Sequence, residues 1–170
     1  MRKFTIAQLE VRSLNRVDIL WLSIYTILIS LTLYLKAPNN KNYFAAELIT
    51  VSFCTGMIIL SPFGLRLRSV YFSSIWFLLS LLFTFNNLSI VWIPILDFLV
   101  YHVIRIIFWK KYDREFIPFT VGRGALYRYV SKIENRGGSI KDKNYMKLLI
   151  VLGVILNFIC LLGLIGVKVK

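Results

Sequence analysis

Five long apolar runs constrain this chain more than any other feature of its sequence. They cover about Ile19–Leu35, Phe44–Leu65, Ser69–Phe85, Leu88–Trp109 and Leu148–Val167, and each contains 17 to 22 residues. Roughly 20 helical residues, rising about 1.5 Å each, cross a hydrocarbon core about 30 Å thick. The chain has 170 residues and is 58% hydrophobic, which is more apolar surface than a soluble core of that size can hide. We therefore expect an all-α integral membrane protein, a bundle of five transmembrane helices.

Residues 69–109 also allow a second topology, with four spans plus a re-entrant segment. These residues are too many for one span and suit two. Asn86-Asn87 can form the tight turn between them, because asparagine tolerates unusual backbone angles. We therefore prefer five spans.

Lysine and arginine alternate in density between the runs, and this alternation predicts an orientation. With five spans, the N-terminal segment and the second and fourth connections share one side, which collects 16 of these residues, while the other side collects 4. The positive-inside rule then places the N-terminus in the cytoplasm and the C-terminus outside. Alanine is scarce beside abundant Ile, Phe, Asn and Lys, which is typical of AT-rich coding sequence. We expect a bacterial inner membrane, with an organellar inner membrane as the alternative.

The runs divide the chain into four parts. Residues 1–18 form a cytoplasmic or interfacial arm, 19–109 a four-helix transmembrane region, 110–147 a basic cytoplasmic loop, and 148–170 the fifth helix with a short outer tail. Within the loop, Ala125–Asn135 is predicted to form an amphipathic helix. Its basic side chains suit anionic lipid headgroups or a partner protein, and we expect this contact from Arg123, Arg128, Lys132 and Arg136.

Composition argues against several other classes of function. The net charge is +13, and nearly all the lysines and arginines that produce it lie between or beside the apolar runs. Membrane topology therefore explains the charge, and we expect no nucleic-acid partner. Cys54 and Cys160 both lie inside apolar runs, and with one histidine they do not build a convincing zinc site. The Gly122-Arg123-Gly124 sequence lacks the further residues of a nucleotide-binding loop. We expect no metal and no cofactor.

The fourth run holds nearly all the ionisable residues that lie inside apolar sequence. Asp97, Tyr101 and Arg105 form one stripe on a helical wheel, whereas His102 points further round. Ionisable residues inside a membrane are costly, so this stripe is the candidate intramembrane polar site. Asp97 and Arg105 are about 12 Å apart along the axis, too far for a direct pair, and Arg105 lies near enough to the inner surface to snorkel.

Asp97 has two interpretations. One is a proton or cation site, assisted by Tyr101 and His102. The other is a structural tie, with Asp97 hydrogen-bonded to Ser, Thr or Asn on a neighbouring helix. Pro94, one turn earlier, is expected to kink the helix and free a carbonyl. Asn157, also near mid-membrane, is the expected partner of Asp97.

Small and polar side chains recur on single faces of other runs, where they let helices approach closely. Ser23, Thr26 and Ser30 follow such a spacing, as do Ser73, Ser80 and Thr84 on the third run and Gly153, Asn157 and Cys160 on the fifth. Packing inside the bundle is their expected role. For Glu47, near the outer end of the second run, a surface neighbour such as Lys41 is an adequate explanation.

Three classes of function follow from these residues. The first is a non-catalytic subunit of a membrane complex or an oligomeric scaffold, bound to lipid and to other subunits or copies of itself. The second is an oligomeric ion or proton channel, or a transporter component, that uses Asp97 and Arg105. The third is an intramembrane enzyme that uses His102 as a base. We prefer the first, because the chain has little outside the membrane and no catalytic motif.

Overall fold

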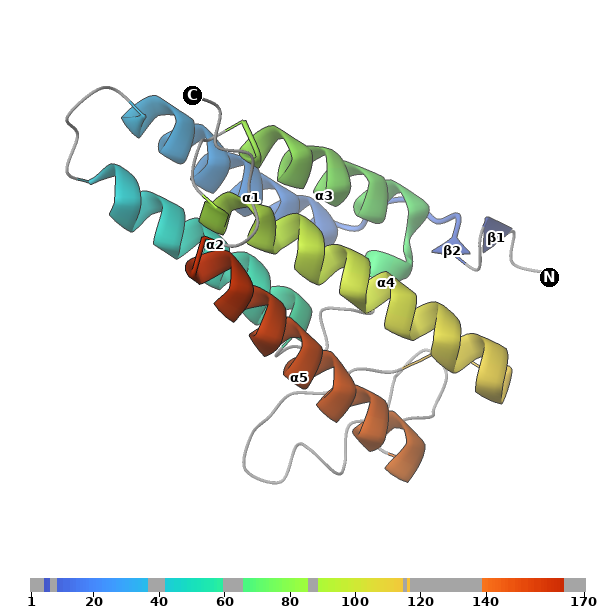
Figure 1. The fold of residues 1–170 in the computed structure, drawn as a ribbon. Helices are drawn as coiled ribbons and strands as arrows, with labels where there is room; N and C mark the ends of the chain where they lie inside the picture. Colours follow the sequence, from blue (N-terminus) through green and yellow to red (C-terminus); the bar gives the residue numbers. More distant parts are fainter. Residues whose placement is uncertain are drawn as a thin grey trace.

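The described part of the chain forms a bundle of five α-helices in the computed structural model (Figure 1). The structure describes residues 5–6, 9–36, 42–59, 66–85, 89–114, 116 and 139–163. The helices are α1 (Arg16–Leu35), α2 (Tyr43–Ile59), α3 (Val70–Phe83), α4 (Ile93–Tyr112) and α5 (Ile140–Leu161). A short 3₁₀ helix, η2 (Ser89–Trp92), leads into α4, and two short strands, β1 (Thr5–Ile6) and β2 (Leu9–Glu10), precede α1. The predicted all-α class is confirmed apart from this small ribbon.

Three of these helical stretches are long and apolar enough to cross a membrane: α1, the stretch Ser89–Tyr112 and α5. The helices α2 and α3 are apolar but shorter. Each helix also exposes large apolar side chains, among them Ile27, Ile49, Leu78, Val103 and Val154. An apolar exterior of this extent is compatible with a location in a membrane.

Capping residues set where α1 and α5 begin. The Asn15 side chain accepts a hydrogen bond from the Asp18 backbone N–H at 2.7 Å, and the Asp18 carboxylate accepts one from the Asn15 N–H at 3.1 Å. Ser139 and Asp142 form the same reciprocal box before α5. These contacts satisfy backbone donors that the start of a helix otherwise leaves unpaired.

The fifth helix begins earlier than its apolar run predicted. The run starts at Leu148, but α5 starts at Ile140 and its first two turns are polar. The capping box explains the difference, because it starts the helix before the apolar sequence does. The amphipathic helix expected at Ala125–Asn135, with Arg123, Arg128, Lys132 and Arg136, lies outside the described residues.

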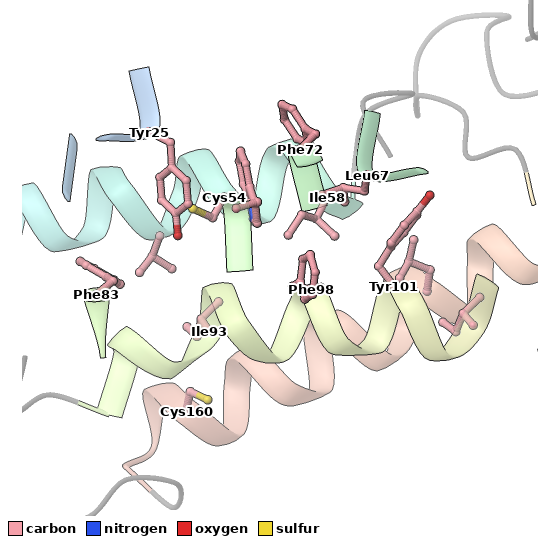
Figure 2. Packing of buried hydrophobic residues seen from close by; sticks show 14 of the residues in the cluster. Tyr25, Cys54, Ile58, Leu67, Phe72, Phe83, Ile93, Phe98, Tyr101 and Cys160 are labelled. Carbon is pink, nitrogen blue, oxygen red and sulfur yellow. The ribbon is translucent and has the colours of Figure 1, made fainter. Parts of the chain in front are cut away.

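Successive helices run in alternating directions, so α2 and α4 are parallel and pack against each other (Figure 1). Helix α4 also packs against α5, and α1 packs against α2 and α3. Aromatic rings, among them Tyr25 and Phe72, fill the centre (Figure 2). The ring centroids of Tyr25 and Trp76 are 4.4 Å apart, and those of Phe72 and Trp76 are 5.8 Å apart. All three side chains are completely buried. Helix α4 is enclosed by α2, α3 and α5, all of which pack against it.

A buried aspartate joins the start of α1 to the segment between α2 and α3. Asp18 is completely buried, and its carboxylate lies 2.8 Å from Arg12 and 2.5 Å from Arg66. The two arginines remain partly exposed. Asp18 therefore ties three points of the chain together while it also caps its helix.

The same end of the bundle holds the other ion pairs among the described residues. Arg68 lies 3.0 Å from Glu10, and Glu10 forms a parallel β-bridge with Ser69. Arg114 binds both carboxylate oxygens of Asp142, at 3.0 and 2.7 Å. The start of α1 and residues 66–69 are thus at the same end of the bundle as the end of α4 and the start of α5, which extend further (Figure 1). Of the described lysines and arginines, all except Lys36 and Arg105 belong to this basic end.

Replacement of Asp18 by Asn should lower the free energy of unfolding by about 1–3 kcal/mol, because Arg12 and Arg66 lose their shared anion while the capping acceptor is kept. Chemical unfolding in detergent micelles measures the difference. Asp113→Asn is the matched control, because Asp113 is exposed and asparagine tolerates its left-handed conformation. Equal stability of the two variants would show that the Asp18 ion pairs are not stabilising.

Candidate functional site

The polar stripe expected on the fourth run lies on the buried face of α4. Asp97 and Tyr101 are completely buried and Arg105 is 1% exposed. His102 points away from this stripe toward α3 and is half-buried. Arg105 therefore lies inside the protein, and the expectation that its head group snorkels to the surface is wrong. Tyr101 packs edge-on against His102, with ring centroids 5.3 Å apart.

Asp97 is tied to two other helices through Thr55 of α2. The Thr55 hydroxyl donates to Asp97 Oδ2 at 2.8 Å, and Asn157 Nδ2 of α5 donates to Thr55 Oγ1 at 3.5 Å. We call Thr55, Asp97 and Asn157 the polar junction. The expected partner Asn157 is therefore at the site, where its amide bonds Thr55 and also acts on the Asp97 carboxylate.

Two oxygens of the polar junction are left over. Asp97 Oδ1 and Asn157 Oδ1 are both buried, and neither has a hydrogen-bond partner in the described part of the chain. Arg105 is two helical turns from Asp97, and Asp97 forms no ion pair with any described residue. Burial of an ionised carboxylate without a partner costs several kcal/mol. The junction therefore favours a neutral carboxyl group or a bound cation over a bare charge.

Pro94 does not kink the middle of α4. The α-helix begins at Ile93, so Pro94 lies in its first turn, after the 3₁₀ turn η2. Proline is well tolerated there, because the first N–H groups of a helix have no partner within it. In place of the expected kink, the helix changes from 3₁₀ to α geometry after Trp92, less than two turns before Asp97.

His102 faces a separate pocket between α3, α4 and β2. His102 Nε2 and Ser73 Oγ are 3.0 Å apart, and the His102 ring packs on Phe98 with centroids 4.4 Å apart. The pocket measures about 320 Å³. It is lined by Leu9, Ser73, Ser74, Phe77, Phe98 and His102. A serine hydroxyl in contact with an imidazole resembles a nucleophile and its general base. A catalytic triad also needs an acid that orients the other ring nitrogen, and none of the described residues supplies one.

The two cysteines flank the polar junction as free, buried thiols. Cys54 belongs to α2 and Cys160 to α5 (Figure 2), and both lie close enough to Asp97 to interact with its charge. Within the described ranges, no three His, Cys, Asp or Glu side chains gather as metal ligands would.

Two polar groups inside the bundle, the partly buried Thr55 and the buried Glu47, are missed or misread from the sequence. Thr55 belongs to no polar stripe of its run, and only its contact with Asp97 identifies it. Glu47 was assigned to the surface, but it is completely buried, and neither carboxylate oxygen has a hydrogen-bond partner among the described residues. The surface interpretation of Glu47 is therefore wrong. Its position on the α2 face that packs inside the bundle explains the burial.

The polar faces expected to pack inside the bundle divide into two groups. Ser73 and Ser80 of α3 and Gly153 and Cys160 of α5 are buried, as expected, and Ser80 bonds Tyr25 across the bundle at 2.9 Å. The face of α1 formed by Ser23, Thr26 and Ser30 is exposed instead. Helix α1 uses Thr32, which lies 3.1 Å from Thr50 of α2, for its buried polar contact there.

Comparison with known proteins gives no assignment: no protein-family model, no curated protein and no solved structure matches this chain.

Replacement of Thr55 by Val should lower the free energy of unfolding by about 1–3 kcal/mol. The change keeps the shape of the side chain but leaves Asp97 Oδ2 and Asn157 Nδ2 unpaired inside the bundle. Thermal unfolding of the detergent-solubilised protein measures the loss. Thr84→Val is the matched control, because the Thr84 hydroxyl bonds the Leu81 carbonyl of its own helix and lies outside the junction. A loss as large in the control would contradict a special role for the junction.

Proposed function

We propose that the chain is a five-span integral membrane protein that acts as a non-catalytic subunit of a membrane complex or as an oligomeric scaffold. The apolar exterior and the alternating direction of the five helices support five spans. The short helices α2 and α3 fit this arrangement because a neighbouring helix covers part of each. Both helices are shorter than the hydrocarbon core is thick, and local thinning of the bilayer accommodates this mismatch at a modest cost in free energy.

The exposed polar face of α1 carries the proposal of assembly. Ser23, Thr26 and Ser30 recur at helical spacing and point away from the rest of the bundle. In a bilayer this face would meet lipid chains, which offer nothing to a hydroxyl group. Small and hydroxylated side chains at this spacing are typical of contacts between membrane helices, because they permit close approach and hydrogen bonds across the interface.

A shallow groove beside this face adds to its fit for another helix. It measures about 350 Å³ and runs along α1 to Ile75 of α3. It is lined by Leu14, Ile19, Leu22, Ser23, Thr26, Ile27 and Ile75. Apolar walls with two hydroxyl groups match the chemistry of an apolar transmembrane helix, from a second copy of this chain or from another subunit.

We propose a cytoplasmic N-terminus and an outer C-terminus, in a bacterial inner membrane. The clustering of described basic side chains at one end supports this orientation under the positive-inside rule. Anionic lipid headgroups are the proposed partners of this end, together with Arg123, Arg128, Lys132 and Arg136 of the loop.

The unpaired oxygen of Asp97 favours a second candidate function, a pathway for protons or cations. Asp97 and Arg105 occupy the same buried face of α4, and the buried Glu47 lies on the parallel helix α2. Buried ionisable side chains in apolar bundles are characteristic of ion and proton pathways. A purely structural hydrogen bond through Asp97 would not require an oxygen without a partner among the described residues, so this oxygen supports the pathway.

Labelling of single introduced cysteines tests the topology, with both native cysteines replaced by serine. Cysteines at Ser13 and Lys141 should react with a membrane-impermeant reagent only from the cytoplasmic side, and cysteines at Asn42 and Phe85 only from the outer side. All four positions are exposed in the structure. Labelling at Lys141 from the outer side would indicate four spans, and labelling at Phe85 from the cytoplasmic side would indicate a re-entrant segment.

Mass measurement in mild detergent tests the assembly. The native chain should purify as an oligomer or with other membrane subunits, and Ser23→Leu with Thr26→Leu should release it as a monomer. Bulky side chains on this face keep its apolar character but prevent close helix approach. Ser52→Leu, at an exposed serine of α2, is the matched control and should leave the assembly intact. A native chain that purifies alone as a monomer contradicts the proposal.

A further inference from the structure

The two oxygens left over in the polar junction are both acceptors, and each needs a donated hydrogen atom. Asp97 Oδ1 and Asn157 Oδ1 are buried acceptors without a donor among the described residues. Thr55 already donates to Asp97 Oδ2 at 2.8 Å and receives Asn157 Nδ2 at 3.5 Å. A carboxyl O–H on Asp97, pointed at the Asn157 carbonyl, would close a ring of three hydrogen bonds.

We propose that Asp97, Thr55 and Asn157 form a site that binds and releases one proton. In the loaded state, a proton from water is bound to Asp97 Oδ1, and this O–H donates to Asn157 Oδ1. On release, the O–H bond breaks, the proton returns to water and its electron pair remains on the Asp97 carboxylate. This inference rests on the second candidate function, for which it names the proton as the ion.

The hydrogen-bond inventory of each side chain explains why these residue types suit the task. A neutral carboxyl group donates one hydrogen bond and accepts others, and an amide both donates and accepts. Thr55 can donate to one neighbour while it accepts from another. Each of the three side chains therefore donates once and accepts once in the loaded ring, and no buried polar atom of the ring is left unsatisfied.

The released state retains two contacts that offset part of the cost of the charge. The Thr55 hydroxyl still donates to the carboxylate, and the Asn157 amide can turn its N–H groups toward Asp97 Oδ1. Both contacts are stronger to a charged acceptor than to a neutral one. The site can therefore exist in two states without a rearrangement of the helices.

The titratable groups on the helices around Asp97 place no cation directly beside it, so they favour its protonated form. Cys54 on α2 and Cys160 on α5 lie close enough to Asp97 to interact with its charge, and neither thiol is a cation in any protonation state. On α4, Tyr101 and His102 follow one turn on, and Arg105 lies two turns away. The described lysines of α5 lie in its first two turns, at the opposite end from Asn157. Glu47, further along α2, carries the other buried carboxyl group.

Infrared difference spectroscopy of the full chain in detergent tests the site. A protonated carboxyl group has a carbonyl band separate from that of a carboxylate, so a pH titration should show such a band disappear reversibly. Asp97→Asn should abolish the band, whereas Glu47→Gln should retain it. Thr55→Val should shift it to higher frequency, because the carbonyl loses its donor, and Thr55→Ser should restore the native position.

Three outcomes would overturn the inference. The first is a band that stays constant over the whole pH range in which the protein is folded. The second is a titrating band that Thr55→Val and Asn157→Leu leave unchanged, which would mean that the ring does not form. The third is loss of the band on addition of sodium chloride at constant pH, which would indicate a sodium site.

Proton flux into vesicles that contain the native chain or Asp97→Asn separates this inference from the function on which it rests. Equal flux for the two proteins, with a band that titrates as expected, leaves the proton site intact and contradicts the pathway. A difference in flux without a titrating band contradicts the site.

Discussion

The hydrogen bond from Thr55 to Asp97 is the contact on which the arrangement of the central helices depends. Apolar side chains can slide past one another with little change in energy, and in a lipid surrounding they gain nothing by leaving the bilayer for the bundle. A hydroxyl group and a carboxyl group inside such a bundle have few possible partners, so their contact fixes how α2 and α4 are aligned. Asn157 extends the same constraint to α5. Tyr25 with Ser80 and Thr32 with Thr50 act in the same way on α1. The described bundle is thus held in register by a small number of polar contacts, while aromatic packing fills the space between them.

Much of the architecture follows from one-dimensional patterns in the sequence. Each apolar run contains a helix, and the periodicity of α4 places Asp97, Tyr101 and Arg105 on one face and His102 elsewhere. Helix ends are less predictable from hydropathy, because short-range capping decides them: Ser139 and Asp142 start α5 before its apolar sequence begins. Pro94 was placed inside a span, but the 3₁₀ turn before Ile93 makes it a first-turn residue.

The rotation of each helix in the bundle cannot be obtained from its own sequence. A polar face on an apolar helix has the same periodicity whether it meets a neighbour in the bundle or points away, so the face of Ser23, Thr26 and Ser30 was expected inside and is exposed. Glu47 was misread for the converse reason, since a carboxylate near a helix end is normally solvated. Thr55 could have been found only with knowledge that α2 and α4 are neighbours, since they are separated by α3 in the sequence. Pairing between non-consecutive helices is a property of the whole fold.

The contact between Asp18 and Arg66 also has a consequence for the order in which the protein is made. The two residues are 48 positions apart, and Glu10 and Arg68 are 58 apart, so neither pair can form until all of α2 has left the ribosome. The N-terminal arm therefore stays undocked while α1 and α2 are synthesised. It can dock only once residues 66–69 have been made, so the order of synthesis sets the order in which this end of the bundle assembles.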